Sequence, residues 1–220
     1  MTASGVVALV PVRSFRNGKT RLASALTPEE RAAIGRRMLA RVAGAAAESD
    51  VVDAVVVISP DPEVLDAAVT LGPGIVPLPQ AADAFGLNGA IDQGRAWAER
   101  RGAAALLVLF GDLPLLTAHD VRAMVRLDAP VVVAPDRHGT GTNALLLRLN
   151  PESAAFTFQF GQDSFAHHGA EARRLRLTVD VFTTRGTAFD LDTPADYDLL
   201  GAEGWRLGAG NEALANAGRS

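Results

Sequence analysis

The sequence predicts an α/β fold in which helices cover both faces of a mostly parallel sheet. Short runs rich in Val and Ile alternate with longer stretches rich in Ala, Arg and Glu, which is the pattern of repeated strand-helix-strand units. The apolar runs contain few polar residues, as is typical of strands buried on both faces. With 220 residues, of which 48% are hydrophobic, the chain fits a single domain with a sizeable core.

Strands and helices are predicted to alternate along the chain. The predicted strands are Val6–Val12, Ala54–Ser59, Gly74–Leu78, Ala104–Phe110, Val131–Ala134, Asn143–Leu149 and Leu175–Val181. The first helix has the clearest start, because Thr27 can cap it, Pro28 suits its first position and Glu30 completes a capping box. Further helices are predicted to start at Asp61-Pro62, near Leu87, at Thr117, at Asp163 and after Thr193-Pro194.

These elements are predicted to form one domain over residues 1–200. The segment 201–220 is rich in glycine and has no strong periodicity. We therefore expect it to be a loosely ordered C-terminal tail.

Charge and composition narrow the classes of partner and location. The 21 basic and 25 acidic side chains give a net charge of −4, which argues against a nucleic acid or an anionic membrane as partner. The chain has no cysteine, so disulfides, thiol nucleophiles and thiolate metal sites are excluded. It has no apolar run near the roughly 18 residues of a membrane span, and residues 1–4 lack the basic start of a secretory signal. We expect a cytoplasmic protein that binds small molecules, and the sequence leaves its oligomeric state open.

The loop after the first predicted strand is rich in cations and contains a glycine. In an open α/β sheet, ligands bind beyond the carboxyl ends of the strands, so this loop is predicted to bind a triphosphate. The residues assigned to that role are Arg13, Gly18, Lys19 and Arg21. Gly18-Lys19-Thr20 matches the end of the Walker A motif, but Arg13 stands where its first glycine would fall. A P-loop NTPase or kinase is therefore the more distant alternative, because the predicted helix start at Thr27 comes well after the lysine.

Three carboxylates are candidates for a metal site. Asp112 follows a buried strand in a tight Gly-Asp-Leu-Pro corner, and Asp190 and Asp192 share one face if their segment is extended. Carboxylate oxygens suit Mg²⁺ that bridges nucleotide phosphates, so we expect these three residues to bind Mg²⁺. The alternative is that Asp112 and Asp192 only cap the helices that follow them.

Two later segments are predicted to bind an anion. The loop 136–143 alternates glycine with threonine, and its N–H groups and hydroxyls could form an anion-binding nest. Gly161 and Ser164 flank a predicted helix start, whose free N–H groups favour negative charge. His167 and His168 are predicted to lie on a solvated helix face, because no partner for a triad or a metal site is spaced to meet them.

Together these motifs resemble the guanylyltransferases that activate a small phosphorylated acid for assembly of coenzyme F-420. The resemblance covers about residues 5–200 and is carried by the segments Val10–Arg13, Gly18–Leu22, Phe110–Pro114, Asp136–Asn143, Phe160–Ser164 and Phe189–Thr193. It implies a Rossmann-like three-layer nucleotidyltransferase fold, like that of nucleotide-diphospho-sugar transferases, with GTP and Mg²⁺ as requirements. Cytidylyl- and molybdopterin-type nucleotidyltransferases share this fold but not the motifs at 139–143 and 160–164. A regulatory nucleotide-binding module would not need three carboxylates beside an acceptor pocket.

The resemblance also implies roles for individual residues. Thr142, Gly161 and Ser164 would bind the acceptor acid. The charges of Asp112, Lys19 and Arg13 suit this chemistry, and we predict that these three are the catalytic residues. The bacterial members most similar to this chain use phosphoenolpyruvate and GTP, and they release pyrophosphate and form enolpyruvyl-diphosphoguanosine. Other members use 2-phospho-L-lactate or 3-phospho-D-glycerate. Because the product is unstable, the resemblance implies a hand-off to the next transferase of the pathway.

Two further expectations follow from this chemistry. The attacking phosphate is already ionised at neutral pH, so no general base is needed. Asn88 is predicted to recognise the guanine edge of GTP, because a side-chain amide offers both donors and acceptors.

Overall fold

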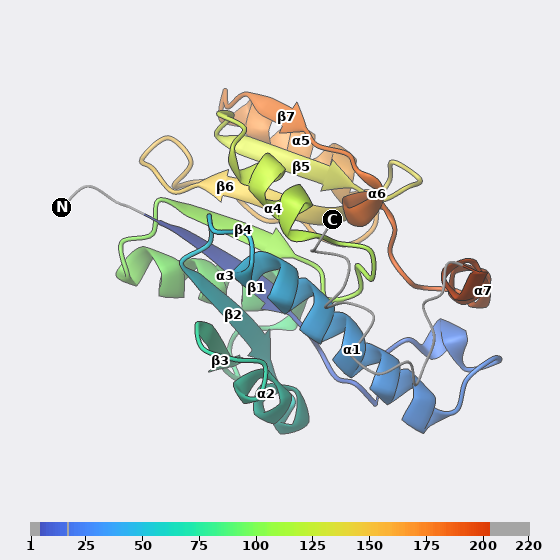
Figure 1. The fold of residues 1–220 in the computed structure, drawn as a ribbon. Coiled ribbons are helices and arrows are strands. Elements are labelled where there is room, and N and C mark those ends of the chain that lie inside the picture. The colour runs from blue at the N-terminus through green and yellow to red at the C-terminus, as the bar shows by residue number, and fades with distance from the viewer. Residues whose placement is uncertain (1–4, 17, 203–220) are drawn as a thin grey trace.

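The computed structural model describes residues 5–16 and 18–202, which form one seven-stranded sheet flanked by helices (Figure 1). The strand order along the sheet is β3-β2-β1-β4-β6-β5-β7. The strands are β1 (Val6–Pro11), β2 (Ala54–Ser59), β3 (Ile75–Pro79), β4 (Ala105–Leu109), β5 (Val131–Pro135), β6 (Thr142–Arg148) and β7 (Val179–Val181). The helices are the 3-10 helix η1 (Thr20–Leu22) and the α-helices α1 (Pro28–Ala47), α2 (Pro62–Val69), α3 (Gly86–Arg100), α4 (Ala118–Val125), α5 (Ser164–Arg174), α6 (Arg185–Ala188) and α7 (Pro194–Ala202).

The direction of β6 decides which residues share an edge of the sheet. β1 is parallel to β2 and β4, whereas β6 is antiparallel to both β4 and β5. The carboxyl ends of β1, β4 and β5 therefore meet the amino end of β6, which begins at Thr142. Ligands of open α/β sheets bind at this edge. The predicted α/β fold with a mostly parallel sheet is confirmed.

Helices cover both faces of the sheet, which gives three layers (Figure 1). Along β1, Val6, Ala8 and Val10 belong to one hydrophobic cluster, and Val7 and Leu9 belong to a second. The first cluster includes residues of α1, α2 and α4, and the second includes residues of α3 and α5. Alternate residues of the strand are therefore buried on opposite faces, which explains why the strands are almost entirely apolar.

The helix starts predicted at Thr27, Asp61 and Thr117 are confirmed. In α1, the Glu30 backbone N–H donates to the Thr27 hydroxyl at 3.2 Å, and the Thr27 N–H donates to the Glu30 carboxylate at 2.8 Å. This is the predicted capping box, which satisfies backbone donors that a helix start leaves unpaired.

The strand predicted over Leu175–Val181 is wrong in its first half, since β7 covers only the last 3 residues. Arg176 adopts a left-handed backbone with φ 58°, and the N–H of Leu177 donates to the Ala172 carbonyl at 2.9 Å. This turn closes the end of α5. The apolar residues Leu175 and Leu177 pack against the second hydrophobic cluster from the helix end rather than from a strand.

The last described helix joins the opening part of the chain. Leu200 of α7 packs with Ile34 and Met38 of α1. α7 continues to Ala202, so the helix enters the segment predicted to be a tail, and residues 203–220 lie outside the described residues. Within the described ranges, the structure has no helix long and apolar enough to cross a membrane.

Candidate functional site

A cleft of about 700 Å³ lies at the edge of the sheet where β1, β2 and β4 end. It is lined by the opening loop, by the loop between β3 and α3, and by the corner after β4. The residues of the predicted phosphate site and metal site that line it are Arg13, Gly18, Lys19, Arg21, Asp112 and Asp192. The structure therefore brings together residues from three distant parts of the sequence.

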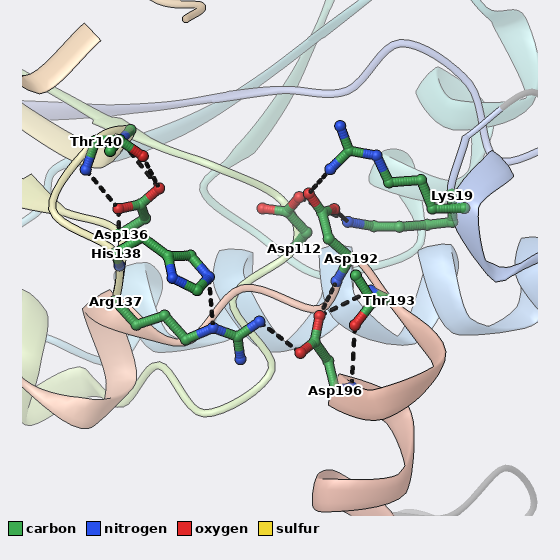
Figure 2. Close-up of polar contacts among 11 residues, drawn as sticks. Lys19, Asp112, Asp136, Arg137, His138, Thr140, Asp192, Thr193 and Asp196 are labelled. Carbon is green, nitrogen blue, oxygen red and sulfur yellow. Dashed lines mark hydrogen bonds and ion pairs between the residues drawn. The ribbon is translucent and has the colours of Figure 1, made fainter. Parts of the chain in front are cut away.

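Lys19 connects the opening loop to the carboxylates (Figure 2). Its Nζ lies 2.7 Å from Asp112 Oδ2 and 2.8 Å from Asp192 Oδ1, and its side chain is only 14% exposed. Burial alone lowers the pKa of Lys19, but the charges of Asp112 and Asp192 and the hydrogen bonds to them raise the pKa above its usual value. Lys19 is therefore a positive charge bound between two carboxylates.

The backbone around Lys19 does not support the P-loop alternative. Lys19 has a left-handed φ of 54° and precedes the 3-residue helix η1, whereas the long helix α1 begins at Pro28. A Cβ at Gly18 would lie 2.7 Å from the carbonyl oxygen of Ser14, so the turn itself requires glycine here.

Two arginines of the predicted phosphate site are exposed. Arg21 Nη1 lies 3.6 Å from Asp192 Oδ2, and the Arg21 side chain is 75% exposed. Arg13 is exposed and forms no ion pair with any residue that the structure describes. Both guanidinium groups are therefore accessible to an anion in the cleft.

Asp190 lies close to the other two predicted metal ligands. Burial, followed by the charges of Asp112 and Asp192, raises the pKa of Asp190 above its usual value. Two buried oxygens, Asp112 Oδ1 and Asp190 Oδ1, have no hydrogen-bond partner among the described residues. Unpaired buried oxygens of this kind fit a cation.

The three carboxylates do not form a complete metal site by themselves. In the described parts of the chain, no group of three or more Asp, Glu or His side chains is arranged to hold a metal ion. Asp192 is instead paired with Lys19 and Arg21. Mg²⁺ is commonly bound by one or two carboxylates together with nucleotide phosphates and water, so the unpaired oxygens of Asp112 and Asp190 fit an ion that binds with the nucleotide.

Neither Asp112 nor Asp192 serves as the cap of a helix. Thr117 caps α4, and the side chain of Asp112 contacts Lys19 instead. At the start of α7, the hydroxyl of Thr193 accepts from the N–H of Asp196 at 3.3 Å, and the Asp196 carboxylate accepts from the N–H of Thr193 at 2.7 Å. The structure therefore does not support the capping alternative.

The loop between β5 and β6 forms the predicted nest, but the chain's own Asp136 fills it. Its carboxylate accepts from the backbone N–H groups of His138 and Thr140 at 3.0 and 2.9 Å (Figure 2). It also accepts from the N–H of Gly141 at 2.9 Å. Burial alone raises the pKa of Asp136, but these hydrogen bonds lower it below its usual value. The prediction that these donors bind a substrate anion is therefore wrong.

Arg137 links the same loop to the carboxylate of Asp196 (Figure 2). Its Nη2 lies 2.5 Å from Asp196 Oδ1, and its guanidinium stands over the Phe189 ring at 5.0 Å from the centroid. The second oxygen of Asp196 accepts from the N–H groups of Asp192 and Thr193. Arg137 and Asp196, to which the sequence assigns no role, position the backbone that carries Asp192.

Of the predicted acceptor-binding residues, Gly161 and Ser164 lie at the start of α5, and Thr142 of β6 contacts α5 through His168. Thr142 and Ser164 are each 2% exposed, while Gly161 is exposed and has a φ of 134°. The N–H of Ser164 donates to the Gly161 carbonyl at 3.3 Å. Of the described residues that line the cleft, none is Thr142, Gly161 or Ser164. These three form a second region, which we call the acceptor region.

Aromatic rings connect the acceptor region to the cleft. Phe110, which lines the cleft, lies with its ring centroid 5.2 Å from that of Phe160. Phe160 directly precedes Gly161. The two regions are therefore neighbours.

The prediction of a solvated face is wrong for His168, although His167 is exposed. His168 is 0% exposed, and its ring lies edge-on to Phe160 at 4.6 Å and stacks with Phe156 at 6.2 Å. Its Nδ1 lies 3.0 Å from Thr142 Oγ1. Burial, together with the charge of His167, lowers the pKa of His168 to about 4.

Asn88 has a different partner from the one predicted. Its Nδ2 donates to the Phe160 carbonyl at 3.0 Å, and its Oδ1 accepts from the Phe160 N–H at 2.9 Å. Asn88 is absent from the described residues that line the cleft. The amide therefore anchors the segment before Gly161, and its geometry gives no support to recognition of guanine.

Comparisons with known proteins show which proteins this chain is similar to. A family model described as guanylyl transferase CofC like matches residues 6–204. A protein from Sphaerobacter thermophilus named phosphoenolpyruvate guanylyltransferase is 42% identical over 196 residues, which cover 88% of this chain and 91% of that protein. A protein from Methanothermobacter thermautotrophicus named 2-phospho-L-lactate guanylyltransferase is 36% identical and covers 90% of this chain and 85% of its own length.

Solved structures share the fold. A candidate nucleotide-diphospho-sugar transferase from Desulfovibrio desulfuricans G20 superposes with a TM-score of 0.70 at 18% identity, and the match covers 91% of this chain and 87% of that one. The fold is therefore that of nucleotide-diphospho-sugar transferases. From its sequence matches, the chain belongs to the CofC-like guanylyltransferase family.

Proposed function

We propose that this guanylyltransferase transfers GMP from GTP to phosphoenolpyruvate and forms enolpyruvyl-diphosphoguanosine and pyrophosphate in coenzyme F-420 biosynthesis. The names of several relatives at 36% to 42% identity support phosphoenolpyruvate as the acceptor. The observation that carries the proposal is the position of Lys19 between Asp112 and Asp192, inside a cleft that two exposed arginines line.

The reaction needs no proton transfer. An oxygen of the acceptor phosphate attacks the α-phosphorus of GTP, a new P–O bond forms, and the bond to the β-phosphate breaks to release pyrophosphate. The barrier arises from bringing two polyanions together and from charge that develops on the leaving group. Arg13 and Arg21 attract the triphosphate, and the ammonium of Lys19 stabilises the charge on the leaving pyrophosphate.

Asp112 and Asp190, with Asp192 beside them, are the residues that would hold Mg²⁺. The bound ion would neutralise phosphate charge and favour in-line displacement. In the protein alone, Lys19 supplies the positive charge that Asp112 and Asp192 require. We further propose a cytoplasmic location and a hand-off of the unstable product to the next transferase.

The test incubates the purified protein with GTP, Mg²⁺ and one of three acids, together with the next enzyme of the pathway as a trap. The expected result is release of pyrophosphate with phosphoenolpyruvate. Absence of turnover with phosphoenolpyruvate, 2-phospho-L-lactate and 3-phospho-D-glycerate alike would contradict the proposal.

One specific observation favours a second acceptor. The relative named for 2-phospho-L-lactate is 36% identical to this chain, a value that overlaps those of relatives named for phosphoenolpyruvate. The acids share a phosphate and a carboxylate and differ in the carbon framework, which a pocket usually discriminates by about 1 to 3 kcal/mol. The ratio of kcat/KM for the two acids decides between them.

The role of Asp112 has its own test. Asp112→Asn removes a charge at an unpaired buried oxygen, so kcat is expected to fall by about two to three orders of magnitude. Asp50→Asn, at an exposed surface ion pair, is the matched control. If Asp112 had only a structural role, Asp112→Asn would instead lower the melting temperature strongly and would cause little loss of kcat in the folded fraction.

A further inference from the structure

His168 has a hydrogen-bond arrangement that fixes its tautomer. The backbone N–H of Gln159 donates to His168 Nε2 at 3.1 Å, so Nε2 carries no hydrogen. Since the buried ring is neutral at pH 7, the single ring hydrogen is on Nδ1. The contact of 3.0 Å is therefore a hydrogen bond from Nδ1–H to the hydroxyl oxygen of Thr142.

This bond leaves the hydroxyl hydrogen of Thr142 available. A threonine hydroxyl has one hydrogen to donate and can also accept. Its oxygen accepts from His168, and among the described residues the hydroxyl has no other hydrogen-bond partner. The bond from the ring also restricts the directions in which this hydrogen points.

The surrounding packing makes the arrangement rigid. His168 lies one turn after Ser164 on α5, so the two side chains share a helix face. Phe156 and Phe160 contact the ring, and Asn88 anchors the backbone of Phe160 through two hydrogen bonds. A rigid donor loses little conformational entropy when a ligand binds.

We propose that His168 is a positioning residue for the acceptor acid: its Nδ1–H orients the Thr142 hydroxyl so that the hydroxyl hydrogen is donated to an anionic oxygen of the acceptor. The inference rests on the proposed function and on the role in acceptor binding that the family resemblance implies for Thr142. His168 transfers no proton and touches no reacting atom.

The first test concerns the tautomer and is independent of any activity. In a ¹⁵N NMR spectrum of the ligand-free protein at pH 7, His168 is expected to show a protonated Nδ1 and an unprotonated Nε2. Thr142→Val is expected to shift the Nδ1 resonance and to leave that of the exposed His167 unchanged. A hydrogen on Nε2 overturns the inference.

The second test separates positioning from a merely structural role. His168→Asn places an amide N–H near the position of Nδ1, whereas His168→Gln places its polar group near that of Nε2. We expect KM for phosphoenolpyruvate to rise about tenfold or more in the Gln variant and by less than about threefold in the Asn variant, with KM for GTP unchanged in both. His167→Asn is the matched control.

A Thr142→Val background completes the design. In the Thr142→Val background, His168→Gln is expected to have no further effect on KM for phosphoenolpyruvate, because the hydroxyl that His168 orients is already absent. Equal effects of Asn and Gln, or an equal change in KM for GTP, overturn the inference. If the wild type turns over none of the three acids, the proposed function fails, while the NMR spectrum and a phosphoenolpyruvate titration of the Nδ1 resonance still decide the role of His168.

Discussion

The cleft and the acceptor region use polar groups in opposite ways. In the cleft, Arg13 and Arg21 are exposed, and Lys19 is paired with Asp112 and Asp192, of which Asp112 has a further oxygen without a partner. In the acceptor region, Thr142 and Ser164 are almost fully buried. The nearby donors of the loop after β5 are already bound to Asp136.

This difference between exposed and buried polar groups indicates how each region binds its ligand. The cleft can exchange partners, because a nucleotide that brings its own charge can replace the contacts between Lys19 and the carboxylates. The acceptor region is organised before any ligand binds, because its hydrogen bonds join α5, β6 and the segment 156–161. Affinity for the nucleotide is therefore expected to depend on charge, and selection of the acceptor on shape.

Removal of the Lys19 charge is expected to have the largest effect. Lys19→Met should lower kcat by about two to three orders of magnitude, because the proposed stabilisation of the leaving pyrophosphate by the Lys19 ammonium is lost. Arg16→Met is the matched control, since Arg16 lies in the same loop but pairs with Glu63 outside the cleft. Pyrophosphate release under saturating substrates is the measurement, and equal losses in the two variants would mean that only the total charge of the loop matters.

A pH titration of stability probes the acceptor region. His168 is neutral in the folded protein down to a pKa of about 4, whereas an unfolded histidine takes up its proton near pH 6.5. Between these values the unfolded state binds more protons, so stability falls as pH decreases from 6.5 to 4, by about 3 kcal/mol from this group. The free energy of unfolding in urea, compared between the wild type and His168→Asn, should show a steeper loss in the wild type; parallel curves would contradict the buried neutral ring.

Asn88→Ala is expected to have the smallest effect and to act on stability rather than on base specificity. Two hydrogen bonds to Phe160 are lost, which should destabilise the protein by about 2 kcal/mol. The ratio of kcat/KM for GTP to that for ATP should remain unchanged. A loss of the preference for GTP would restore Asn88 as the residue that recognises guanine.

Much of the fold could be predicted because its signals are local. The capping box of Thr27 and Glu30 and the uninterrupted apolar strands are visible in consecutive residues. The short length of β7 could not be predicted, because Leu175 and Leu177 are apolar residues that pack from the end of α5 and not from a strand. The pairing of β6 with β4 could not be predicted either, because no local pattern shows which strand lies on its other side.

For the site, the sequence indicates which groups carry charge but not which groups the chain itself has already paired. Asp136 and Asn88 have their polar atoms engaged by backbone that is near only after folding. A usable signal did exist for Asp196, because Thr193-Pro194-Ala195-Asp196 has the same pattern as the capping box at Thr27. No comparable sequence pattern predicted that His168 is buried beside Thr142.

The antiparallel direction of β6 also bears on the order in which the two regions assemble. β5 and β6 form a hairpin in which Ala134 pairs with Ala144, so the paired residues are close in sequence. β1 pairs with β4 across a long stretch of chain, since Val6 pairs with Ala105. Contacts close in sequence form faster, because less loop-closure entropy opposes them. The hairpin that ends in the Asp136 turn can therefore be an early folding unit, and the framework of the acceptor region can precede the cleft as the chain folds.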